Sequence, residues 1–172
     1  MGRFSHEAVA IDPRTGIAYQ TEDEVNGLIY RFKPTVTGSL HKGGVLQAMV
    51  FKSNSSMDTR NWKETNVLKK ELYDIGWITL QDTDSPENDL RFRGHEAGAA
   101  IFARGEGMWY DNDKVYVSLV KQTGGATANS GGHVERNSIT ESNATAAVLT
   151  STQSNVSVTI YGQRLKFKVK HN

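Results

Sequence analysis

The chain has 172 residues, a length that suits one ordinary domain, and 37% of them are hydrophobic. Its 20 basic and 19 acidic residues leave a net charge of +1, which argues against nucleic acid or an anionic membrane surface as a partner. The sequence contains no cysteine and no apolar run near the ~18 residues that cross a bilayer, so disulfides, thiolate chemistry, Cys-ligated zinc and a membrane-spanning helix are excluded.

Short β-like runs separated by turns occupy the first part of the chain. Pro13 and Gly16 favour a turn between the first two runs, and Asn26-Gly27 is a strong hairpin signal before the third. Four short strands in about fifty residues is the size of one propeller blade. The sequence therefore predicts an antiparallel meander with strands over residues 8–11, 17–21, 28–33 and 45–51.

The later elements are a mixture of clear and weak signals. A further strand is predicted over 77–80, and Asn88 or Asp89 is placed to cap a short helix over Leu90 to Ala100. Hairpins are predicted over 107–120 and, from the alternation of apolar and polar residues, over 156–169. Between them, residues 126–154 are rich in Ser, Thr, Asn, Ala and Gly, a composition that predicts weak order because it offers little apolar surface to bury.

Two His-Glu pairs suggest a zinc site, in which a second histidine one helical turn later completes the metal-binding face. The residues four positions after His6 and His95 are Ala10 and Ala99. Neither pair therefore has its second ligand, and the zinc-protease interpretation fails.

Acidic residues concentrate just after the second predicted strand, at Glu22, Asp23 and Glu24, while Glu7 lies just before the first. Antiparallel pairing would bring these ends together. Converging carboxylates suit a hard cation such as Ca²⁺, which takes six to eight oxygen ligands. The alternative is a solvated acidic turn, which the pattern alone favours.

Arg104 and Glu106 form a third candidate. In a strand their side chains point to the same face, so a cation-binding carboxylate and an anion-binding guanidinium can meet at one ligand. That combination suits a metal-bound phosphate. The alternative is a cross-strand salt bridge on a solvated face.

Several segments resemble the PhoX family of bacterial alkaline phosphatases over roughly residues 1–125: GRFSHEAVAIDPRTGIAYQTED, GLIYRFKP, GGVLQAMVF and FARGEGMWYDNDKVYVSLVKQTGG. The resemblance implies an all-β, partial β-propeller with one short helix. It also implies hydrolysis of phosphate monoesters with calcium and iron as cofactors, and export to the periplasm or beyond.

Residue by residue, the resemblance makes Glu7 of His-Glu-Ala and Glu106 of Arg-x-Glu-Gly metal ligands, with Arg104 as the phosphate contact. Glu22 and Asp23 are further candidate metal ligands, and the sequence does not say which of the two faces the metal.

The sequence departs from the family pattern in three ways, of which the missing thiolate and the short length favour a rival, non-catalytic module that keeps at most a calcium site. The family's Cys-Glu-Glu iron-ligand segment is missing. Six blades of ~40 residues need about 240 residues, so this chain cannot close such a ring. The blade pattern also dissolves after Gly125, which leaves residues 126–172 as a diverged segment. An incomplete ring has open sheet edges, so self-association is expected.

Overall fold

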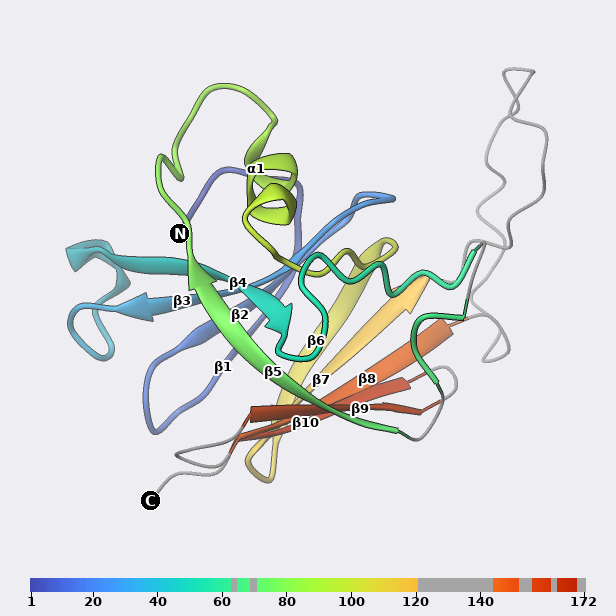
Figure 1. Cartoon of the computed structure of the whole chain (residues 1–172). Helices are drawn as coiled ribbons and strands as arrows, with labels where there is room; N and C mark the ends of the chain where they lie inside the picture. Colours follow the sequence, from blue (N-terminus) through green and yellow to red (C-terminus); the bar gives the residue numbers. More distant parts are fainter. Residues whose placement is uncertain (63–64, 69–70, 121–143, 152–155, 162–163, 170–172) are drawn as a thin grey trace, which may run out of the picture.

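The computed structural model describes residues 1–62, 65–68, 71–120, 144–151, 156–161 and 164–169. Within these ranges the chain is mostly antiparallel β-sheet with a single α-helix (Figure 1). The expected all-β class with one short helix is confirmed. None of the described helices is long and apolar enough to cross a membrane.

The first strands form the expected meander, each antiparallel to the one before it. A fifth strand continues the same sheet by pairing with the fourth, and it begins five residues before the predicted Trp77. The 3-10 turn Leu40–Lys42 precedes the fourth strand. The strands are β1 (His6–Ile11), β2 (Ala18–Glu22), β3 (Ile29–Pro34), β4 (Gly44–Phe51) and β5 (Leu72–Thr79).

The second half of the sheet contains the two predicted hairpins, β6–β7 (Gly105–Asp111 and Lys114–Val120) and β9–β10 (Val156–Tyr161 and Arg164–Val169). Strand β8 (Ala144–Ser151) pairs with β7 and β10, although weak order was expected there. Backbone pairing with these two strands, and with β9 at one further position, supplies hydrogen bonds that the composition does not reveal. The remainder of that expectation, residues 126–143 and 152–154, lies outside the described ranges.

Two apolar clusters fill the opposite faces of the sheet formed by β2, β3 and β4. Neighbouring residues such as Ile29 and Tyr30 belong to different clusters, as the alternation of side chains along a strand requires. Because both faces are covered, the strands are rich in buried residues on both sides rather than alternately exposed. One cluster includes Tyr19, Met49, Phe51, Phe102 and Val117, and the other includes Ala18, Phe32, Leu46, Leu80 and Leu90.

Helix α1 (Leu90–Glu96) covers one of these faces and ends earlier than the predicted Ala100. The reason is Gly98, whose φ of +112° lies in the region that glycine tolerates and a helix does not use. Beyond it the chain turns back along the sheet, where the Ala100 N–H donates to the Met49 carbonyl at 2.9 Å and the Phe102 N–H to the Gly27 carbonyl at 2.8 Å.

The two ends of the strand order, β1 and β6, lie side by side (Figure 1). Arg104 and Glu106 therefore come to the same region as Glu7 and the acidic turn after β2, although about eighty residues separate them in sequence.

A candidate metal and phosphate site

The pairing of β1 with β2 brings the first acidic residues together as expected. His6 lies opposite Glu22 in the register, so Glu7 is one position from the end of β2. The Asp23 N–H donates to the Ser5 carbonyl at 2.9 Å, which ties the acidic turn to the start of β1. Glu7 itself is exposed.

Strand β6 reaches this turn because Gly105 has no side chain. A Cβ at Gly105 would lie 2.8 Å from the Thr21 Cβ and 3.0 Å from the Glu22 carbonyl oxygen, closer than packed atoms tolerate. The Thr21 hydroxyl donates to the Glu106 carbonyl at 2.7 Å, which fixes the approach. The glycine thus lets Arg104 and Glu106 stand beside the acidic turn.

Arg104 holds Asp23 in a two-point ion pair. Its Nε lies 2.5 Å from Asp23 Oδ1 and its Nη2 lies 2.8 Å from Asp23 Oδ2, the fork geometry in which arginine recognises carboxylates and phosphates. The same Nη2 is 3.9 Å from Glu106 Oε1. Arg104 adopts a left-handed backbone with φ of +46°, which costs a non-glycine residue of order 1–3 kcal/mol. Strain of this kind is concentrated at functional sites.

Glu106 feels the charge of the other carboxylates. Its pKa is raised by burial, then by the negative charges of Asp23 and Glu7, and Arg104 only partly opposes this. Asp23 and Glu7 are therefore close enough to Glu106 for their charges to act on it. A cation placed among them would relieve their repulsion.

These residues fit calcium in chemistry, because all three donors are carboxylate oxygens. They do not form a ready coordination shell, since no group of three Asp, Glu, His or Cys side chains within the described ranges is close enough together to hold an ion. Both oxygens of Asp23 are bound by Arg104. Thiolate-bound iron does not fit the chain, which has no cysteine.

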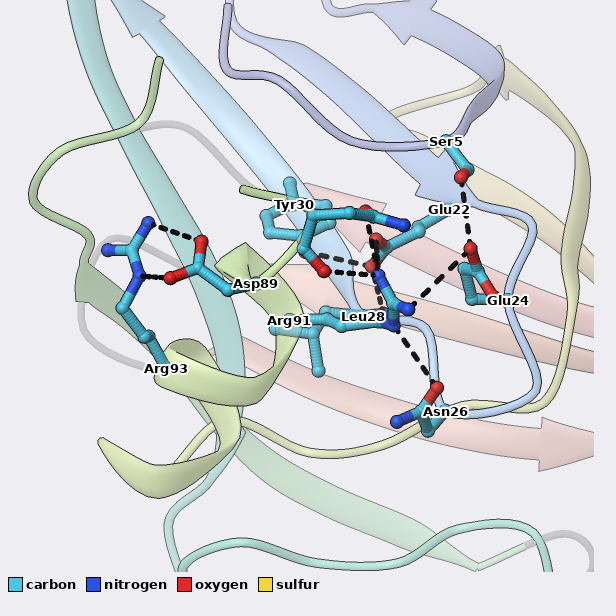
Figure 2. Close-up of polar contacts among 10 residues, drawn as sticks. Ser5, Glu22, Glu24, Asn26, Leu28, Tyr30, Asp89, Arg91 and Arg93 are labelled. Carbon is cyan, nitrogen blue, oxygen red and sulfur yellow. Dashed lines mark hydrogen bonds and ion pairs between the residues drawn. The ribbon is translucent and has the colours of Figure 1, made fainter. Parts of the chain in front are cut away.

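The Glu22 side chain lies in a buried cluster under helix α1 (Figure 2), whereas that of Asp23 pairs with Arg104. Its Oε2 accepts hydrogen bonds from the Leu28 N–H at 3.0 Å and the Tyr30 hydroxyl at 2.8 Å. Its Oε1 has no hydrogen-bond partner within the described part of the chain and lies 3.8 Å from Arg91 Nη1. Burial raises the pKa of Glu22 above its ordinary value. Of the two candidates, only Asp23 joins Arg104 and Glu106.

Sequence reasoning missed Arg91, which proves to be the buried cation behind the acidic turn. Arg91 and Arg93 occupy one short helix and have similar neighbours in the sequence, so nothing local distinguishes the buried arginine from the more exposed one. The useful signal is Gly94, because a Cβ there would lie 2.6 Å from Leu28 Cδ1 and the glycine marks the side of α1 that faces the sheet.

Comparison with known proteins extends the resemblance seen in the sequence. The family described as Alkaline phosphatase PhoX matches residues 1–169, well beyond residue 125. No curated protein matches.

Among solved structures, Pseudomonas fluorescens PhoX in complex with vanadate, a transition state analogue, is similar, with 17% sequence identity and a TM-score of 0.55. The alignment covers 95% of this chain and 31% of that chain, so this chain spans less than a third of the solved protein. At this identity the likeness shows the fold, and it agrees with the expected all-β class. With the match to residues 1–169, it follows that the chain belongs to the PhoX family of alkaline phosphatases.

Proposed function

We propose that this chain supplies part of the active site of an alkaline phosphatase that hydrolyses phosphate monoesters, and that alone it is a poor catalyst. The observation that carries the proposal is the meeting of Arg104, Asp23 and Glu106 at the junction of β2 and β6. Family membership gives the reaction class, and the paired charges give a chemical reason for it.

Arg104 is the proposed phosphate contact. Its guanidinium already binds two oxygens of Asp23 in the planar geometry that also suits two phosphate oxygens. A phosphate would have to compete with Asp23 for this fork. Once exchanged, the guanidinium would stabilise negative charge that develops on the phosphoryl oxygens in the transition state.

Glu7, Asp23 and Glu106 are the proposed calcium ligands, with water and the substrate supplying further oxygens. A bound calcium ion would polarise the phosphoryl oxygen and help to position the nucleophile. Glu22 is a weaker candidate because its carboxylate faces Tyr30 and Arg91 instead. Iron is implied by the resemblance alone, as is export to the periplasm or beyond, and neither enters the chemistry assigned to these residues.

The rival proposal is a non-catalytic binding or assembly module that keeps the calcium site only. The observation that favours it is the Arg104–Asp23 ion pair, because it engages both the guanidinium proposed to bind phosphate and a carboxylate proposed to bind calcium. In addition, no three Asp, Glu, His or Cys side chains in the described ranges lie close enough together to hold an ion. The two proposals make the same prediction for calcium and opposite predictions for turnover.

Calcium titration by calorimetry tests the part that both proposals share. We expect weak binding, about 10⁻⁴–10⁻³ M, weakened further about ten-fold by Glu106→Gln. Arg104→Ala should act in the opposite direction, because it frees the Asp23 oxygens and removes a competing cation. Glu87→Gln, in an exposed loop, is the control. Equal affinity in all four proteins would contradict the proposed site.

Turnover of p-nitrophenyl phosphate with calcium and iron supplied separates the two proposals. A weak but genuine activity should fall by about 10²–10³ in Arg104→Ala and Glu106→Gln, the range seen for loss of a charge-stabilising donor. Arg14→Ala, which breaks an arginine–carboxylate pair at Asp113 outside the site, is the control. If the wild-type chain shows no turnover above background, the non-catalytic module is favoured. Robust activity lost in both variants would show that the chain is complete alone, and activity unchanged by both would remove these residues from the site.

A further inference from the structure

Arg91 is a buried cation on the face of α1 that packs behind the acidic turn (Figure 2). Its guanidinium is hydrogen-bonded both to the loop after β2 and to the loop just before α1. Nε donates to Asn26 Oδ1 at 3.2 Å, and Nη1 donates to Asn88 Oδ1 at 2.8 Å and to the Asn88 carbonyl at 3.1 Å. The guanidinium is therefore held in one orientation between the helix start and the turn.

In this orientation Arg91 faces two carboxylates that flank Asp23. Nη1 lies 3.8 Å from Glu22 Oε1, and Nη2 lies 3.7 Å from Glu24 Oε1. The printed contacts show that Asp23 faces Arg104, while its neighbours Glu22 and Glu24 face Arg91.

We propose that Arg91 is a positioning residue for the candidate site: by pairing with Glu22 and Glu24 it fixes the turn from behind and directs Asp23 at Arg104. The link to phosphate chemistry rests on the proposed function, whereas the link between Arg91 and the Asp23–Arg104 pair rests on the contacts alone. Two arginines thus act on opposite sides of one three-residue turn.

Backbone bonds carry this position to the site. The Arg104 N–H donates to the Glu24 carbonyl at 2.8 Å, and the Gly27 N–H donates to the same carbonyl at 3.0 Å. Glu24 also accepts a hydrogen bond from the Ser5 hydroxyl at 3.1 Å. A movement of Glu24 therefore moves both residues of the Asp23–Arg104 pair, and small displacements are enough to weaken an aligned charged pair.

Only arginine can make all of these contacts from one side chain. Its planar fork reaches Asn26, Asn88 and both carboxylates together, whereas a lysine ammonium is a single compact charge. Arg91→Lys keeps the charge and loses the fork. Glu24→Gln removes one of the two carboxylates and keeps the acceptor for Ser5, in a side chain that is already partly exposed.

Arg93→Lys is a matched control because it makes the same change in the same helix. Arg93 pairs with Asp89, with Nε 2.8 Å from Oδ2, and lies apart from the acidic turn in Figure 2. The probe is the Nε–H signal of Arg104 in ¹⁵N NMR spectra, assigned by its loss in Arg104→Lys. Its hydrogen exchange reports opening of the Asp23–Arg104 pair.

We expect Arg91→Lys and Glu24→Gln each to speed this exchange about ten-fold or more, after correction for any change in global unfolding, and Arg93→Lys to leave it unchanged. Unchanged exchange in folded Arg91→Lys, or an equal effect in Arg93→Lys, would overturn the proposal. If Arg91→Lys does not fold, Glu24→Gln decides by the same criterion. Calcium titration of the same samples tests the proposed function separately, because a wild-type protein that binds no calcium leaves the exchange result intact.

Discussion

At the scale of single residues, Glu22 and Asp23 show how adjacent acids acquire different chemistry. Glu22 is fully buried against Tyr30 and Leu28, whereas Asp23 is partly exposed and bound to Arg104. Their contrast follows from alternation at the end of β2, where one side chain enters the space under α1 and the next faces β6. Burial raises the pKa of Glu22, so the folded protein holds its proton more tightly than the unfolded chain does.

The pH dependence of stability should report this burial. A raised folded-state pKa contributes stability that is fully present below the ordinary value of 4.5 and is lost as the pH rises through the folded value. Glu22→Gln removes the titration, so its unfolding free energy should fall less than that of the wild type over this window. Urea unfolding at a series of pH values measures the difference, with the exposed Glu87→Gln as control. Parallel pH curves for wild type and Glu22→Gln would contradict it.

Sequence could not choose between these two residues, because the strand end and the covering helix are settled by distant contacts. It did identify Asp23, Glu106 and Arg104 as candidates, through their spacing and through the family resemblance. The sequence could not identify Arg91, because which arginine of α1 is buried depends on which side of the helix meets the sheet.

At the scale of elements, the approach of β6 to β2 depends on Gly105. Gly105→Ala places a Cβ against Thr21 and the Glu22 backbone, and backbone atoms cannot move aside cheaply. We expect a loss of ~1–3 kcal/mol in unfolding free energy, as for overpacked interiors. Gly107→Ala, two residues along the same strand, meets only the Ser118 hydroxyl at 3.3 Å and should change stability by about 0.5 kcal/mol or less. Denaturant unfolding measures both variants. Equal losses of unfolding free energy would show that the approach of β6 to β2 does not depend on Gly105.

Local turn chemistry explains which elements were predicted well. Pro13 with Gly16, and Asn26 with Gly27, delimit β1 to β3, and the hairpin β6–β7 follows from its short polar turn. The predictions went wrong where a single backbone angle or a distant partner decides. Gly98 ends α1 through its positive φ, and β8 forms by pairing with strands on both sides.

At the scale of the whole molecule, the strand order leaves β1 and β6 at the two ends of the sheet. These end strands lie against each other, a long-range arrangement that no local pattern in the sequence indicates. Within the described ranges they form no backbone ladder with one another. Neither strand has a second ladder partner in the described part of the chain, so opening of the β1–β6 contact would expose N–H and C=O groups to pairing by another chain. Val9 and Ile11, 51% and 47% exposed, add apolar surface along β1.

Self-association through these edges is accordingly predicted, and sedimentation velocity over a range of concentrations measures it. Val9→Lys places a charge on the β1 edge, a substitution that blocks strand addition, and should reduce the associated fraction. Val25→Lys makes the same change at an exposed valine in the acidic-turn loop, outside any strand, and should leave association unchanged. A single monomeric species at every concentration would refute the prediction. Association that is equally sensitive to both substitutions would assign it to general apolar exposure, because only pairing at the edge distinguishes Val9 from Val25.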